Sequence, residues 1–113
     1  MREIIFSTQN FSKRDAINCR SGIPLQEFDG DSQTIENIVA AAIMKDTDTD
    51  TGEIKDISVL KTADMVYYTS ISATICDNME EVIDLIDEEG TINVRIDKRL
   101  SKGKREFLTI IVL

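Results

Sequence analysis

The sequence predicts a mainly β protein: a five-stranded barrel with one helix between its third and fourth strands and a small N-terminal extension. Two observations favour this class. Apolar or alternating runs of strand length recur from residue 33 to residue 113 with polar turns between them, and residues 77–89 alone show a clear helical stripe. A chain of 113 residues can bury one core but not two. We therefore expect a single domain, residues 1–113, with the extension at 1–30 and the β-barrel core at 31–113.

The N-terminal extension is expected to hold one short strand and one short helix. Residues 1–8 form an apolar run suited to an edge strand, and residues 10–21 suit a helix with Ser12 as its N-cap. Gly22 fits just past the end of that helix. Residues 23–25 are expected to be an extended connector, because Pro24 cannot lie inside a helix. The helix should turn three side chains inward: Ala16, Ile17 and Cys19.

Residues 33–44 fit either a helix or a strand. Three consecutive alanines and the spacing of the isoleucines suit a helix. We prefer a strand, because the polar loop 46–53 follows and leads into a second strand-like run at 54–61, which together make a hairpin. The first strand would turn these side chains inward: Ile35, Val39, Ala41 and Ile43. The second would bury Ile57, Val59 and Leu60.

The third strand and the helix follow a turn at residues 62–64. Residues 65–72 have strand composition, with Tyr67 facing the core and Tyr68 on the more exposed face. Asp77 is expected to cap the helix 77–89, and Gly90 to end it. The helix carries an apolar stripe at helical spacing, made of Met79, Val82, Ile83 and Ile86.

The last quarter of the chain reads as two strands joined by a basic loop. Residues 91–97 alternate apolar and polar side chains, so Ile92, Val94 and Ile96 should face inward. Residues 107–113 are almost wholly apolar, which predicts a strand covered on both faces. The loop between them, residues 98–105, contains Gly103 to turn the chain. Three strands, a helix and two strands is the element order of the OB-fold.

Charge is unevenly distributed along this acidic chain, whose net charge is −8. Residues 91–113 hold six basic and two acidic side chains, residues 1–20 hold four and two, and residues 21–90 hold three and seventeen. Salt screens a protein's field beyond roughly 8–10 Å, so a local basic patch can bind a polyanion despite the overall charge.

The basic loop predicts contacts with nucleic-acid phosphates, and aromatic side chains predict stacking with bases. The candidate nucleic-acid-binding residues are Lys98, Arg99, Lys102, Lys104, Arg105 and Tyr68. Phe107, at the exit of the loop, suits either a stacking platform or the core. A solvated, charged hairpin that resists edge-to-edge pairing would have the same composition.

Catalysis and metal binding find no support in the sequence, and no cofactor is expected. The chain has no histidine, and its two cysteines, Cys19 and Cys76, are too far apart for a CxxC motif, so we expect reduced, buried thiols in a cytoplasmic protein. The loop 46–53 resembles a calcium loop, but the sixth and twelfth positions of that motif are Thr51 and Ile57 rather than Gly and Glu. No membrane span or signal peptide is predicted.

Three segments resemble small replication proteins of phages and mobile elements of Gram-positive bacteria: TADMVYYTSISAT, the helix end DLIDEEG, and SKGKREFLTIIVL. The resemblance covers roughly residues 23–113, and residues 101–108 are its most specific part. Those proteins are regarded as single-stranded-DNA-binding proteins of OB type. The resemblance implies that this chain coats single-stranded DNA without sequence preference, with the five basic residues on phosphates and Tyr68 as a stacking candidate.

Two further hypotheses compete with this one. The dense carboxylates of residues 21–90 suit a protein-interaction module, an inhibitor or regulator that binds a basic replication or host protein. The apolar run 107–113 suits a subunit that pairs with a second copy of itself, a homo-oligomer.

Overall fold

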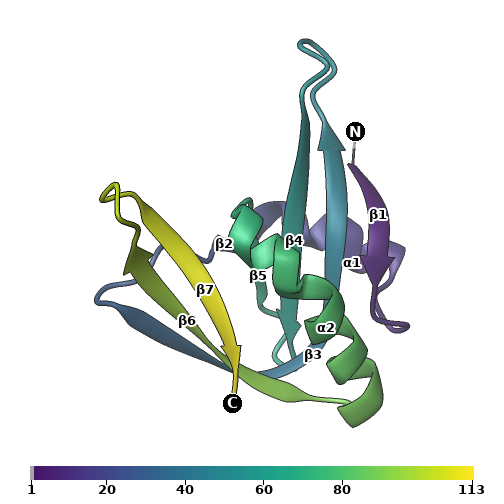
Figure 1. Cartoon of the computed structure of the whole chain (residues 1–113). Coiled ribbons are helices and arrows are strands. Elements are labelled where there is room, and N and C mark those ends of the chain that lie inside the picture. The colour runs from purple at the N-terminus through teal and green to yellow at the C-terminus, as the bar shows by residue number, and fades with distance from the viewer. Residues whose placement is uncertain (1) are drawn as a thin grey trace.

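The computed structural model describes residues 2–113 as one curled β-sheet with two helices (Figure 1). The strands are β1 (Arg2–Ser7), β2 (Ile23–Pro24), β3 (Ser32–Thr47), β4 (Ile54–Thr62), β5 (Tyr67–Ser70), β6 (Ile92–Leu100) and β7 (Glu106–Val112). The helices are α1 (Lys13–Asn18), which runs into a 3₁₀ turn at Cys19–Ser21, and α2 (Ala73–Glu89).

The long strand β3 is the centre of the sheet. Its 16 residues pair antiparallel with β4 along one edge, and with both β6 and β1 along the other. The remaining path runs from β4 through β5 to β2, and from β6 to β7. In Figure 1 the β6–β7 hairpin swings away from β4 and β5, and α2 crosses in front of β4 and the lower part of β3. The sheet therefore has the curl of a half-barrel.

The mainly β class and the barrel-like curl are confirmed, but the count of five strands is wrong. The five strands from β3 to β7 keep the predicted order, with α2 between their third and fourth members. The other two come from the N-terminal extension, because β1 adds to the free edge of β3 and β2 pairs in parallel with β5. Among residues 2–113, the sheet path ends at β2 and β7 without a ladder between β5 and β7.

The strand prediction for residues 33–44 is confirmed by β3, but its inward face was assigned wrongly at Val39. The pairing register slips between Ile35 and Ile38 and again between Ile38 and Ala40, with Asn37 at φ 57°. These bulges bury Ile38 and leave Val39 only half-buried. The inward side chains therefore lie three residues apart, at Ile35, Ile38 and Ala41.

Two cores flank the sheet. The larger one lies between the inner face of the curl and α2, which buries the predicted stripe together with Ile75. The smaller one lies on the opposite face of β3 and β4, where α1 and Cys19 cover Ala42, Met44 and Val59. The N-terminal extension is thus the cover of the second core.

The helices start and face differently from the prediction in two places. Ser72 caps α2 through its Oγ, which accepts from the Ile75 N–H at 3.5 Å, so the helix begins four residues before Asp77. Gly90 ends α2 at φ 85°, as predicted. Ser12 caps α1 as predicted, but Ile17 is 59% exposed and Asp15 takes the inward position instead.

The end of β5 and the burial of β7 also differ from the prediction. β5 stops at Ser70, because the chain turns away to the α2 cap, and Ile71 is 65% exposed. β7 is a sheet edge, so the predicted burial of both its faces is wrong: Val112 and Leu113 are 39% and 61% exposed. Pairing of this edge with a second copy stays a prediction. None of the helices in residues 2–113 has the length and hydropathy of a membrane span.

Candidate nucleic-acid interface

The β6–β7 hairpin carries the basic residues, and it is longer than predicted because its connecting loop is only Ser101–Arg105. Backbone bonds close the loop tightly: the Ser101 N–H donates to the Arg105 carbonyl at 2.9 Å, and the Lys104 N–H donates to the Ser101 carbonyl at 2.9 Å. Lys104 sits at φ 60°, a left-handed conformation that glycine adopts most easily, while Gly103 has an ordinary φ. The loop therefore holds three exposed basic side chains at its tip: Lys102, Lys104 and Arg105.

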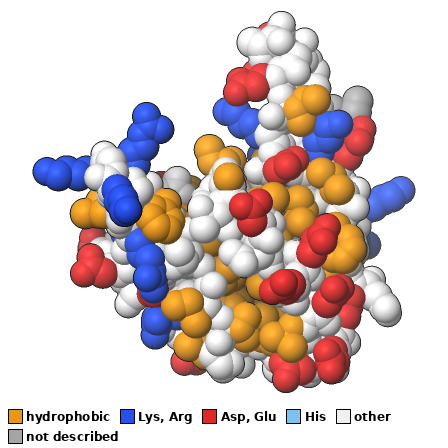
Figure 2. All heavy atoms as spheres, in the orientation of Figure 1, with side chains coloured by type: hydrophobic (Ala, Val, Ile, Leu, Met, Phe, Trp, Pro, Cys, Tyr) orange, Lys and Arg blue, Asp and Glu red, His pale blue; other side chains and the backbone are white. Residues whose placement is uncertain are grey.

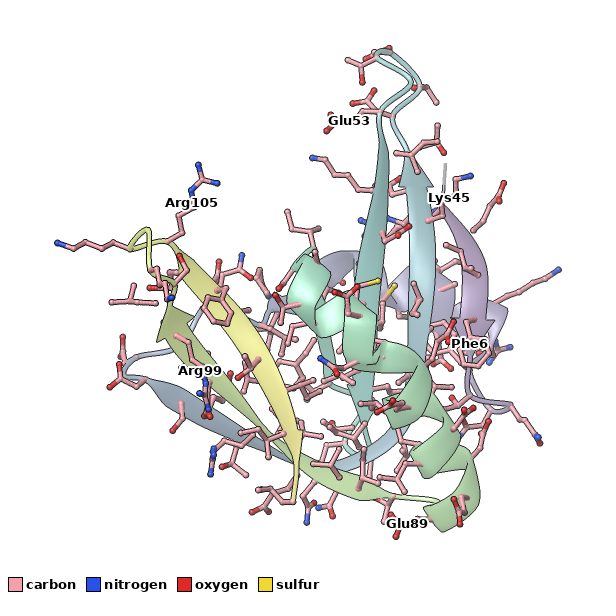
Figure 3. All side chains as sticks on the ribbon, in the orientation of Figure 1. Phe6, Lys45, Glu53, Glu89, Arg99 and Arg105 are labelled. Carbon is pink, nitrogen blue, oxygen red and sulfur yellow. The ribbon has the colours of Figure 1, made fainter. Side chains whose placement is uncertain are left out.

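Arg99 lies on the outer face of the hairpin, below the loop (Figure 3). Its guanidinium is 3.6 Å from the Asp97 carboxylate, which also accepts from Arg95 at 2.9 Å. Antiparallel register places Phe107 directly opposite Arg99, and Phe107 is half-buried. An aromatic ring thus lies beside a partly neutralised guanidinium, on the face that continues from the basic tip.

Lys98 points to the other side of the hairpin and is held in place. Its ammonium donates to the Phe28 carbonyl at 2.6 Å and lies 4.2 Å from the centre of the Phe28 ring. Its backbone N–H donates to the Asp31 carbonyl at 2.8 Å. The structure therefore separates Lys98 from the other basic residues and gives it an anchoring contact with residues 28–31.

Tyr68 lies on β5, which shares no ladder with β6 or β7 in the part of the chain that the structure describes. It pairs with Leu60 across β5 and β4 and packs, half-buried, against the larger core. The neighbouring Tyr67 is buried on the opposite face, as predicted.

The outer face of β4 and β5 is occupied by the N-terminal extension. The Asp15 carboxylate accepts from the Tyr67 hydroxyl at 2.6 Å and from the Lys61 ammonium at 2.8 Å. Burial alone would raise the pKa of Asp15, but the hydrogen bonds from Lys61 and Tyr67 outweigh it and hold that pKa below its usual value. OB-folds commonly bind oligonucleotides on the face of their second and third strands. In this protein the N-terminal extension covers that face, and the bonds that Asp15 accepts from Lys61 and Tyr67 hold the extension in place.

Acidic side chains gather elsewhere. Figure 2 shows them over α2 and the lower part of the molecule, with Lys and Arg projecting from the β6–β7 hairpin. The β3–β4 hairpin has an acidic tip, marked by Glu53 in Figure 3, opposite in charge to the tip marked by Arg105. The structure thus separates the two signs onto different projections.

The calcium-like loop at that acidic tip uses its carboxylate for the turn itself. Asp48 accepts from the backbone N–H groups of Asp50 and Thr51, at 2.8 and 3.3 Å, and these bonds lower its pKa. Within residues 2–113, no three carboxylate or thiol groups come close enough to hold a metal ion.

Both cysteines are free thiols, Cys19 buried and Cys76 half-buried. Burial raises the pKa of each thiol, which lowers its thiolate fraction at neutral pH. The prediction of two buried thiols holds fully for Cys19 and only in part for Cys76.

Sequence reasoning placed the basic loop but missed the face that continues from it. Arg95, which stands four residues before Arg99, shares that face through the period-two pattern that also turned Ile92, Val94 and Ile96 inward. The alternating pattern alone could therefore have placed Arg95 on this face. The position of Phe107 opposite Arg99 could not be predicted in the same way, because it depends on the cross-strand register and hence on where the loop begins and ends.

Comparison with known proteins agrees with this geometry. The search of curated proteins and the search of solved structures returned no match. A family model described as phage single-stranded DNA-binding protein, of the phi29 type, matches residues 11–112. The match includes most of the N-terminal extension, so the family likeness is not confined to the barrel strands. This chain therefore belongs to the phi29-type family of phage single-stranded DNA-binding proteins.

Proposed function

We propose that the protein binds single-stranded DNA without sequence preference, as a non-catalytic coat during phage replication in the cytoplasm of the bacterial host. The observation that supports this most is the cluster of exposed basic side chains at the tip of the β6–β7 hairpin, in a chain whose net charge is −8. Flexible basic side chains on a projecting loop follow a phosphate backbone without reading base edges.

The contact surface in this proposal runs from the hairpin tip onto its outer face. Lys102, Lys104 and Arg105 neutralise phosphates, Arg99 adds a guanidinium shared with Asp97, and Phe107 stacks with a base. Stacking on one aromatic ring contributes about 1–3 kcal/mol per base. Lys98 and Tyr68 lie outside this surface because both pack against the body of the protein.

The acidic side chains reinforce this orientation. Carboxylates over α2 and at the β3–β4 tip repel a phosphate backbone, so the strand is steered to the β6–β7 side. Recruitment of a basic partner protein by α2 is compatible with this arrangement and stays a prediction.

The test uses two variants with the same change of charge. Lys102→Gln with Arg105→Gln removes two phosphate contacts, while Arg14→Gln with Lys55→Gln removes two exposed charges elsewhere. Each lost contact lowers the slope of log K against log salt by about 0.7 for single strands, so the hairpin variant should lose about 1.4 in slope. The ratio of the affinity of the unmodified protein to that of the hairpin variant should therefore fall by about 7-fold when the salt concentration rises from about 50 to about 200 mM.

Fluorescence anisotropy with a labelled oligothymidylate measures both slopes. The control variant should keep the slope of the unmodified protein. Equal slopes for the hairpin variant and the unmodified protein would contradict the proposed surface. Absence of binding by the unmodified protein at low salt would contradict the function itself.

A further inference from the structure

Three neighbouring hollows lie in a row between the basic hairpin and the N-terminal extension, each sharing lining residues with the next, and we call the row the seam groove. Its first part lies between the start of β7, at Phe107, and the end of β5. Its second part shares Gln26, Ser70 and Ile71 with the first and reaches Arg2 and Arg20. Its third part shares Arg2 and Arg20 with the second and follows β1 and α1 as far as Lys13.

The groove exists because the sheet does not close. In residues 2–113 no ladder joins β5 to β7, and β2 covers only two residues of the β5 edge. The chain turns from β5 into α2 at this gap, which leaves Ile71 65% exposed between the first two hollows. The hollow beside Phe107 and the hollow that reaches Arg20 therefore meet at this gap, where they share Gln26, Ser70 and Ile71.

The charge of the groove is basic at its far end. Lys13 and Arg20 are exposed on its wall, and Arg2 lies there a quarter exposed, 3.6 Å from Asp46. Two carboxylates also line the groove, Glu3 at the far end and Glu106 beside the hairpin. Of the three segments 1–20, 21–90 and 91–113, the first and the last are those in which basic residues outnumber acidic ones.

Apolar side chains lie along the same path. Ile71 stands in the middle of the groove, and Ile17 and Ile4, 59% and 39% exposed, stand at its far end. Alternation of basic and exposed apolar groups suits a single strand, whose phosphates need cations and whose unstacked bases need apolar cover.

We propose that the DNA strand bound by the β6–β7 hairpin continues through the seam groove to a second set of phosphate contacts at Lys13, Arg20 and Arg2. This inference rests on the proposed function and extends it to the N-terminal extension. The occupant is the same strand, because the groove begins beside Phe107 and its far end has the charge that complements phosphate. The extension is then part of the binding surface as well as the cover of the smaller core.

The test compares two double variants on oligothymidylates of two lengths. Lys13→Gln with Arg20→Gln removes the exposed basic charges that line the groove, and Arg14→Gln with Lys55→Gln makes the same change of charge at two exposed positions that do not line it. Oligomers of about 4 and about 16 nucleotides bracket the site sizes of OB-folds. The groove variant should lose about 1.4 in salt slope on the long oligomer and keep its binding to the short one.

Each other outcome has a separate meaning. If the groove variant and the control variant behave alike on the long oligomer, the proposal is overturned, and the groove is left to a protein segment or to solvent. Equal loss on both lengths also overturns it, since it would show a general field effect. If the unmodified protein binds neither oligomer at low salt, the proposed function itself fails, a result distinct from one in which the unmodified protein binds both and the groove variant matches the control. Matching urea unfolding curves for the two variants confirm that folding is unchanged.

Discussion

Replacing Tyr67 with phenylalanine tests how firmly the N-terminal extension is tied to the sheet. The Tyr67 hydroxyl donates to the Asp15 carboxylate at 2.6 Å, and Tyr67 is 8% exposed. A hydrogen bond to a charged group contributes about 1.5–3 kcal/mol. Asp15 keeps its bonds from Lys61 and from the Ser12 N–H, so no buried charge is left unpaired and the loss stays within that range.

The expected result is a fall in melting temperature. For a chain of this size, 1 kcal/mol corresponds to about 4 °C, so Tyr67→Phe should lower the melting temperature by roughly 6–12 °C. Thermal unfolding followed by circular dichroism measures this. Tyr68→Phe is the matched control: it makes the same chemical change on the opposite face of β5, away from Asp15, and should have a clearly smaller effect.

Two results would refute this reasoning. Equal losses for Tyr67→Phe and Tyr68→Phe would show that the bond to Asp15 contributes nothing measurable. An undiminished loss for Tyr67→Phe in an Asp15→Asn background would show that the effect does not pass through the carboxylate.

Three further predictions follow from contacts in the structure. The pKa of Asp15 is lowered in the fold, so its contribution to stability is present above its unfolded pKa of about 3.9 and is lost as pH falls through the lower native value. In urea unfolding, the free energy of unfolding should therefore fall more steeply with decreasing pH for the unmodified protein than for Asp15→Asn. Parallel pH curves for the two proteins would contradict this. At Lys104 the backbone φ is 60°, and glycine adopts this left-handed conformation without the steric cost of a side chain. The free energy of unfolding of Lys104→Gly should therefore be about 1 kcal/mol higher than that of Lys104→Ala, which removes the same charge. Equal stabilities in urea would exclude strain at this position. Lys98→Met removes the hydrogen bond to the Phe28 carbonyl and should lower the free energy of unfolding, measured by thermal unfolding, by about 1–2 kcal/mol. The slope of log K against log salt for DNA binding should stay unchanged. A slope lowered by about 0.7 would instead show that Lys98 contacts the DNA.

The ambiguity of residues 33–44 has a physical origin in β3. Bulges on either side of Ile38 place Ile35, Ile38 and Ala41 on one face at intervals of three. A three-residue spacing is also part of a helical stripe, so local periodicity favoured neither state. The small alanines, which favour a helix by propensity, suit instead a strand that is buried on both faces.

The role of the N-terminal extension could not be read from its own residues. β1 is held by pairing with residues 42–46, and β2 by residues 68–69, both far away in the sequence. The inward turn of Asp15 depends on Lys61 and Tyr67, which lie on β4 and β5. Local patterning found the Ser12 cap and the helix after it, but the partners that fix the helix are non-local.

The basic hairpin was predictable in composition and only partly in arrangement. Alternation identified the two faces of β6, and the charge count identified the loop. The separation of Lys98 from Arg99 follows from the greater length of β6, which extends to Leu100 and so places Lys98 and Arg99 on opposite faces of a strand. The pairing of Arg99 with Asp97 is a consequence of that same conversion.

The central claim is that single-stranded DNA contacts the β6–β7 hairpin, and an amide chemical-shift map tests it most directly. Titration of the isotope-labelled protein with an oligothymidylate should shift the amides of residues 99–107 most, with the acidic turns of α2 and the β3–β4 tip, residues 48–53, nearly unchanged. Shifts concentrated on α2 or on the β3–β4 tip, with a silent hairpin, would contradict the account.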